Sequence, residues 1–107
     1  MKQITPVELA AWLADGAKAK PVLLDVRESW EIETARLPGA IHMPMNEVPG
    51  RLAELDPDQE LVTVCHHGGR SMHVGLFLEK QGFSSVHNLS GGIDGWSRTV
   101  DPSVPVY

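Results

Sequence analysis

Two kinds of hydrophobic pattern alternate along this chain. Short apolar runs of the kind found in buried strands occur at 21–26, 41–43, 61–64 and 86–89. Between the last two, apolar residues recur at helical spacing from Met72 to Leu78, and Gly82 supplies a helix stop. Strands that alternate with helices predict an α/β domain, in which a central parallel sheet of about five strands is flanked by helices.

Capping residues sharpen the prediction of the first helix. Thr5 is suited to the N-cap, Pro6 to the first helical position and Glu8 to the third, and the apolar run that follows ends near Gly16. Further helices are predicted over 47–55 and 93–97, and an extended tail over 101–105. No repeat and no low-complexity linker interrupts the pattern.

Length and charge limit the classes of function. The 107 residues suit one domain, 1–107, with a single core. Nine Lys and Arg stand against fourteen Asp and Glu, a formal net charge of -5, which disfavours nucleic-acid binding. No stretch approaches the length of a membrane span, and no cleavable leader follows Met1. We therefore expect a cytoplasmic protein with no nucleic-acid or membrane partner.

Cys65 is the only cysteine, so it can neither form an internal disulfide nor supply a multi-cysteine zinc site. A lone cysteine is either a small buried hydrophobe or a reactive thiol, and its neighbours decide between these. Cys65 lies between a predicted strand, 61–64, and a predicted helix. The first N–H groups of a helix have no partner within it and stabilise a thiolate, which favours the reactive thiol.

The loop after Cys65 has the composition of an anion-binding site. Glycines let successive backbone N–H groups converge on one point, an arginine supplies a fork of donors, and no acid occurs from 61 to 78. Taken singly, such residues are more often turns, surface charges or solvated polar groups. Together they predict that Cys65 is a catalytic nucleophile and that the substrate is bound by His66, His67, Gly68, Gly69, Arg70 and Ser71. No pair of histidines has an arrangement that indicates a metal, and we expect no metal and no cofactor.

Four segments, in the same order, resemble the rhodanese, or thiosulfate sulfurtransferase, family. The active-site loop of that family is similar to the Cys-His-His-Gly-Gly-Arg-Ser stretch at 65–71. The similarity extends to Leu-Asp-Val-Arg-Glu at 24–28, to the Leu-Pro-Gly-Ala turn and following strand at 37–44, and to the Gly-Gly and Trp segment at 89–96. The resemblance covers almost the whole chain and implies a single-domain member with the three-layer rhodanese-like fold.

The resemblance implies a persulfide mechanism. The Cys65 thiolate would attack the outer sulfur of a small anionic donor such as thiosulfate and release sulfite. The Cys65 persulfide would then pass its sulfur to cyanide, a low-molecular-weight thiol or a protein thiol. Because no second cysteine is present, the acceptor must come from outside, which predicts ping-pong kinetics.

One position departs from the family pattern and leaves the donor open. Many thiosulfate-specific members have Arg directly after the nucleophile, where this chain has His66. A histidine is only partly charged at neutral pH, so its hold on an anion should be weaker and should depend on pH. Mercaptopyruvate, persulfides and protein-bound sulfur remain alternative donors.

The remaining candidates have supporting roles. The resemblance places Asp25 and Arg27 at the end of a strand near the active loop, and a structural salt bridge is the interpretation that we favour for them. The tryptophans are expected in or just below the core, with Trp30 or Trp96 as alternatives for the rim of the site. His42 and His87 are expected to be structural.

Other functions are weighed against sulfur transfer. Tyrosine phosphatases have a longer loop between cysteine and arginine, whereas only four residues intervene here, and a tighter loop suits a sulfane sulfur better than a phosphoryl group. Arsenate reductases commonly use further cysteines. Two alternatives stay open: a sulfur-relay or redox module that delivers sulfur to a partner protein, and a non-catalytic rhodanese-like binding domain.

Overall fold

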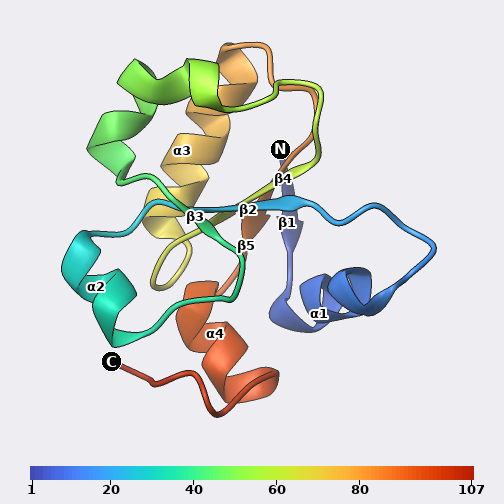
Figure 1. Cartoon of the computed structure of the whole chain (residues 1–107), viewed down its shortest axis with the longest axis vertical. Helices are drawn as coiled ribbons and strands as arrows, with labels where there is room; N and C mark the ends of the chain where they lie inside the picture. The colour runs from blue at the N-terminus through green and yellow to red at the C-terminus, as the bar shows by residue number, and fades with distance from the viewer.

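The computed structural model describes all 107 residues and contains one five-stranded parallel sheet of order β1-β5-β4-β2-β3 (Figure 1). The α/β class and the number of strands are confirmed. The N-terminal edge strand was not predicted. The strands are β1 (Lys2–Ile4), β2 (Val22–Asp25), β3 (Ile41–His42), β4 (Leu61–Val64) and β5 (Val86–Leu89).

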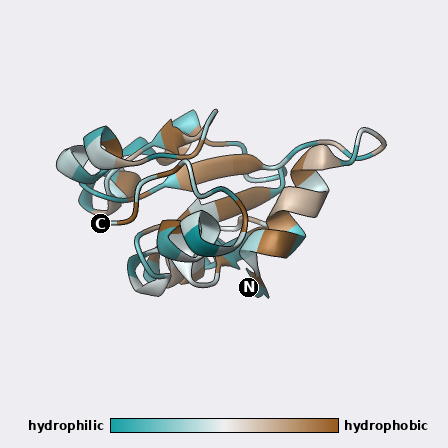
Figure 2. Cartoon of the chain, turned by 90° about the horizontal axis from the view of Figure 1, so that it is seen from below, coloured by the Kyte–Doolittle hydropathy of each residue, from teal (hydrophilic) through white to brown (hydrophobic).

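Helices cover both faces of the sheet, which gives the three-layer arrangement (Figure 1). Helices α1 (Pro6–Ala14) and α4 (Gly92–Thr99) pack on one face, where Leu9 and Trp96 join the core. Helix α3 (Gly69–Lys80) and the 3₁₀ helix η1 (Met45–Glu54) cover the other face. The short helix α2 (Ser29–Thr34) follows β2. Figure 2 shows largely hydrophobic strands between these helical layers, as burial of both sheet faces requires.

Local sequence explains where the helices begin and how regular they are. The predicted capping box at α1 is confirmed: the Glu8 N–H donates to Thr5 Oγ1 at 3.1 Å, and the Thr5 N–H donates to Glu8 Oε1 at 2.9 Å. The helix predicted over 47–55 is present at Met45–Glu54, but it is not α-helical. That segment is the 3₁₀ helix η1, which contains Pro49 and is kinked at Arg51, because proline lacks the N–H that an α-helical interior needs.

Parallel strands bring distant residues to one edge of the sheet. Asp25 pairs in register with Val64, so the chain leaves β2 at Val26 and β4 at Cys65 side by side. The Val26 N–H donates to the Val64 carbonyl at 3.0 Å and extends this pairing by one residue. Ligands collect beyond the carboxyl ends of such strands, so the fold places Cys65 at the edge where a site is expected. No helix has both the length and the apolar character that crossing a bilayer requires.

Candidate active site

The Cys65 sulfur lies beneath its loop, with apolar neighbours on one side and hydrogen-bond donors on the other. The residue is 1% exposed and belongs to the core cluster that contains Val74. The Gly68 N–H donates to Sγ at 3.0 Å, and the Ser71 hydroxyl lies 3.3 Å from the same atom. The Ser71 proton is donated to Asn88 Oδ1, so the Gly68 N–H is the donor directed at the sulfur, and it favours negative charge there.

Gly68 gives the loop its curvature. Its φ of +110° lies in the left-handed region, which residues with a Cβ rarely adopt, and it directly precedes α3. Asn88 on β5 holds this turn from below: its Nδ2 donates to the Gly68 carbonyl at 3.1 Å, and its Oδ1 accepts the Ser71 hydroxyl at 2.5 Å. Asn88 was missed by the sequence analysis, although a polar residue in a buried strand could have signalled it.

The first turn of α4 fixes the other side of the loop. The Ile93 N–H donates to the Cys65 carbonyl at 2.9 Å, and the Asp94 N–H donates to the His66 carbonyl at 3.1 Å. A Cβ on Gly92 would lie 2.3 Å from the His66 oxygen, so only glycine permits this approach. Since the C=O and N–H of a trans peptide point in opposite directions, the N–H groups that follow these two carbonyls face away from α4.

Arg70 does not lie free at the mouth of the site. Its Nη1 and Nη2 donate to Glu31 Oε1 and Oε2 of α2 at 2.6 and 2.8 Å. These two bonds lower the pKa of Glu31 to about 2, against the opposing effect of burial. The segment 61–78 lacks acids, as noted from the sequence, but the fold supplies one from 39 residues away. Arg70 was expected to bind donor oxygens, and in this structure Glu31 occupies both of its terminal nitrogens.

Asp25 and Arg27 form a buried ion pair next to this one. Arg27 is fully buried, and its Nη2 donates to Asp25 Oδ2 and to the Ala35 carbonyl, both at 2.7 Å. Burial acts to lower the pKa of Arg27, yet the bonds to Asp25 and Tyr107 raise it above its ordinary value. The pair ties the end of β2 to the end of α2, which is the structural role that we favoured.

Tyr107 joins the two ion pairs and was missed by the sequence analysis. Its hydroxyl accepts from Arg27 Nη1 at 2.8 Å and donates to Glu31 Oε2 at 2.6 Å. Burial and the bond to Glu31 raise the pKa of Tyr107 to about 12. No periodicity marks such a residue, because it lies in the extended tail that follows the last helix.

The aromatic rings around Tyr107 define the rim of the site. The Tyr107 ring stacks on His66 with centroids 4.0 Å apart and planes 6° apart, and His66 also stacks on the exposed His67. Trp30 meets Tyr107 edge-on and is 61% exposed, so its expected place in the core is wrong and the rim alternative is right. Trp96 is buried in the core as expected.

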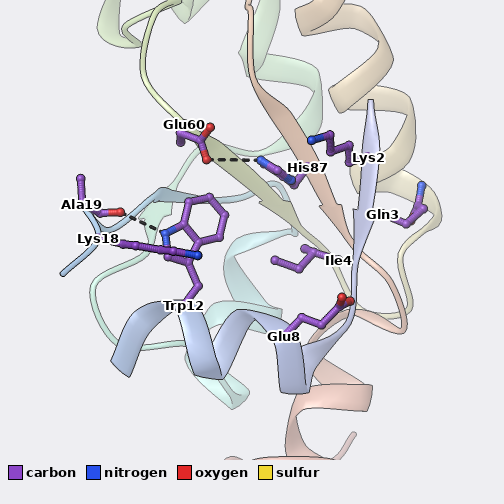
Figure 3. Close-up of a pocket in the computed structure, with 9 residues that line it drawn as sticks. All are labelled: Lys2, Gln3, Ile4, Glu8, Trp12, Lys18, Ala19, Glu60 and His87. Carbon is purple, nitrogen blue, oxygen red and sulfur yellow. Dashed lines mark hydrogen bonds and ion pairs between the residues drawn. The ribbon is translucent and has the colours of Figure 1, made fainter. Parts of the chain in front are cut away.

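A separate groove of about 600 Å³ lies beside α1, away from the cysteine (Figure 3). Figure 3 shows the Trp12 indole with its N–H bonded to the Ala19 carbonyl, and His87 beside Glu60. Glu60 precedes β4 and Cys65 follows it, so the groove and the thiol lie at opposite ends of that strand. None of the predicted site residues lines the groove.

Comparison with known proteins identifies relatives along the whole chain. A family model described as "Rhodanese-like domain" matches residues 5–99. The putative sulfurtransferase YtwF of Bacillus subtilis is 40% identical over 75% of this chain and 77% of its own length. The thiosulfate sulfurtransferase GlpE of Pseudomonas savastanoi pv. phaseolicola is 34% identical over 92% of this chain and 89% of its own. A chloroplastic rhodanese-like/PpiC domain-containing protein of Arabidopsis thaliana is 45% identical over 79% of this chain, which spans only 30% of that relative.

Solved structures agree with these matches. A rhodanese-like domain protein of Staphylococcus aureus superposes with a TM-score of 0.85 at 29% identity and covers 100% of this chain and 99% of its own. Part of an NAD-dependent persulfide reductase of A. fulgidus superposes with a TM-score of 0.69 at 34% identity. That match covers 90% of this chain but 16% of the reductase.

Proposed function

The chain belongs to the rhodanese-like domain family, and we propose that it transfers a sulfane sulfur from thiosulfate, or a related donor, through a persulfide on Cys65. The observation that carries the proposal is the bond from the Gly68 N–H to Cys65 Sγ at 3.0 Å, within a loop held by β5 and α4. The relatives named as sulfurtransferases match over most of their own length, which supports the same reaction class.

Sulfur transfer proceeds in two steps, and each step is a nucleophilic attack by one group with departure of another. The Cys65 thiolate attacks the outer sulfur of thiosulfate, a new S–S bond forms, and sulfite leaves with the electron pair of the broken S–S bond. An external thiolate or cyanide then attacks the outer sulfur of the persulfide, and the Cys65 thiolate is the leaving group. Cyanide becomes thiocyanate, and a thiolate becomes a persulfide. The second nucleophile must be external because the chain has no other cysteine.

The loop amides are the donors that we assign to the transferred sulfur and to the substrate oxygens. The Gly68 N–H already donates to Cys65 Sγ, the atom that carries the negative charge of the thiolate. We propose that the N–H groups of His66 to Ser71 donate to the outer sulfur when the persulfide forms. Arg70 is neutralised by Glu31, so it contributes little net positive charge at the mouth. Because the Arg70 charge is neutralised, the mouth does not select strongly for one anionic donor. Thiosulfate is the donor that we would test first. A cytoplasmic location stays a prediction.

Sulfur loading tests the proposal directly. Incubation with thiosulfate should add the mass of one sulfur atom to the intact protein, and cyanide or dithiothreitol should remove it. The Cys65→Ser variant should gain nothing. His73→Ala, which alters an exposed histidine of α3, should load like the wild type. Equal loading of Cys65→Ser, or no loading from thiosulfate, mercaptopyruvate or a persulfide donor, would overturn the assignment.

A sulfur relay to a partner protein is the second candidate. The part of the persulfide reductase of A. fulgidus that matches this chain shows the fold within a larger sulfur-handling protein. Rapid persulfide formation followed by slow turnover with cyanide and glutathione would favour the relay. Fast turnover with either acceptor would exclude it.

A further inference from the structure

His66, His67 and Asp94 place three metal-ligand atoms together at the outer face of the active-site loop. The ring nitrogens of the two histidines and a carboxylate oxygen of Asp94 all lie within 4.8 Å of one another. His67 Nε2 is 3.9 Å from Asp94 Oδ2. No metal site was predicted from the sequence, since no pair of histidines has a metal-binding arrangement there; the carboxylate comes from α4, far along the chain from the two histidines.

The Nε2 of His66 has no hydrogen-bond partner, although it is shielded from solvent. Burying such a group without a partner costs free energy, so most buried polar atoms are satisfied by protein, water or an ion. The Tyr107 ring stacks on His66 with centroids 4.0 Å apart and holds the His66 imidazole in place, and the exposed His67 ring lies at the same centroid distance from His66. A fixed imidazole with an unpartnered nitrogen, grouped with a second imidazole and a carboxylate, supplies part of a metal-coordination sphere.

Backbone contacts hold the two ligand segments together. The Asp94 N–H donates to the His66 carbonyl at 3.1 Å, and the absence of a Cβ on Gly92 permits that approach. To bind a metal ion, only the side chains of His67 and Asp94 need to move. Tetrahedral bonds of about 2.0–2.2 Å place ligand atoms about 3.3–3.6 Å apart, compared with 3.9 Å between His67 Nε2 and Asp94 Oδ2 and at most 4.8 Å within the group. The His67 side chain is 69% exposed and free to make that adjustment, and the competing Arg98, bonded to Asp94, is 62% exposed.

We propose that His66, His67 and Asp94 bind one divalent transition-metal ion, with a fourth position left open to water or an anion. Two imidazoles and one carboxylate suit zinc, nickel or copper better than magnesium or calcium, which prefer oxygen ligands. The ion would be bound by the residue that follows Cys65 in the sequence, and it would add positive charge to a loop whose Arg70 is neutralised by Glu31. The binding site does not depend on the sulfur-transfer proposal.

Calorimetric titration of the tag-free protein with zinc chloride tests this site. We expect one Zn²⁺ per chain, a rise in Tm with zinc, and no binding of Mg²⁺ or Ca²⁺. His67→Ala and Asp94→Asn should each weaken Zn²⁺ binding by at least about tenfold, since even outer-shell losses cost about 10–100-fold. Both variants should fold, because the His67 side chain is exposed and Asp94→Asn conserves the side-chain shape and the backbone N–H that bonds to the His66 carbonyl.

Two controls separate this site from other zinc-binding groups. His73→Ala removes an exposed histidine outside the cluster and should bind Zn²⁺ like the wild type. Cys65→Ser should also keep its zinc, because the thiol is not one of the three ligands. The proposal is overturned if no zinc binds, if His67→Ala and Asp94→Asn bind as tightly as the wild type, or if binding disappears in Cys65→Ser.

Discussion

Two arginine–carboxylate pairs lie near the same edge of the sheet, and they differ in their access to water. The side chains of Arg27 and Asp25 are 0% and 1% exposed, whereas Arg70 is 35% exposed beside a Glu31 side chain that is 3% exposed. Arg27 also donates to two backbone carbonyls and joins two elements, so it serves the fold. Arg70 opens onto the mouth of the site, so its charge, and the acid that neutralises it, bear on which anions enter.

Removal of Arg27 should have the largest effect. Arg27→Met leaves the Asp25 carboxylate buried without its partner, which should lower the free energy of unfolding by about 3–5 kcal/mol. Urea denaturation, monitored by circular dichroism, measures this loss in the free energy of unfolding. Arg51→Met is the matched control, because Arg51 also binds two carboxylates, Glu47 and Glu54, but at the surface, and should cost under about 1 kcal/mol. Similar losses in the two variants would contradict the structural role of Arg27.

Arg70→Met should weaken catalysis more than it weakens the fold. The variant leaves the Glu31 carboxylate unpaired at the mouth, where it would repel an anionic donor. We expect this repulsion to lower kcat/KM for thiosulfate about 10–100-fold, the equivalent of about 1.4–2.7 kcal/mol.

A second substitution identifies the cause of that loss. Because the repelling charge belongs to Glu31, Arg70→Met combined with Glu31→Gln should recover much of the lost kcat/KM. A double variant as poor as Arg70→Met alone would show instead that the guanidinium itself binds the donor.

The smallest effect concerns the pH dependence of stability at Glu31. Arg70 lowers its folded-state pKa from an ordinary 4.5 to about 2, so Glu31 contributes stability above pH 4.5 that is lost as the pH falls through about 2. The wild type should therefore be more stable than Glu31→Gln at neutral pH, by about 1 kcal/mol given the partial exposure of Arg70, and the difference should vanish near pH 2.

Urea denaturation at a series of pH values measures this difference. Glu33→Gln is the control, because it removes an exposed acid of the same helix without breaking an ion pair. A difference between wild type and Glu31→Gln that stays constant down to pH 2 would contradict the assigned pairing with Arg70.

Local signals were sufficient for the parts of the fold that local chemistry determines. The capping box of α1, the apolar runs of β2, β4 and β5, and the position of Cys65 between a strand and a helix all follow from neighbouring residues. Strand β1 was missed because three residues carry no measurable periodicity, and its pairing with β5 is a tertiary contact.

The surroundings of the thiol were predicted only in part, for a related reason. The loop residues 66–71 are contiguous, so their composition could be read directly. Glu31, Asn88 and Tyr107 reach the site from three other segments, and nothing in their local sequence specifies a partner tens of residues away. The assignment of Arg70 as a free anion ligand was incomplete because the acid that binds it lies outside the stretch that appeared free of acids.

The close approach of Gly92 to the carbonyls of Cys65 and His66 also matters for protein engineering. A cysteine loop transplanted into another scaffold would keep its amino acids but lose the N–H groups of Ile93 and Asp94 that turn its carbonyls outward. Such a graft would have to carry the opening turn of the final helix with it. The smallest unit that can be moved between proteins is therefore the cysteine loop together with the first turn of α4. The two segments approach each other so closely at Gly92 that no side chain fits there.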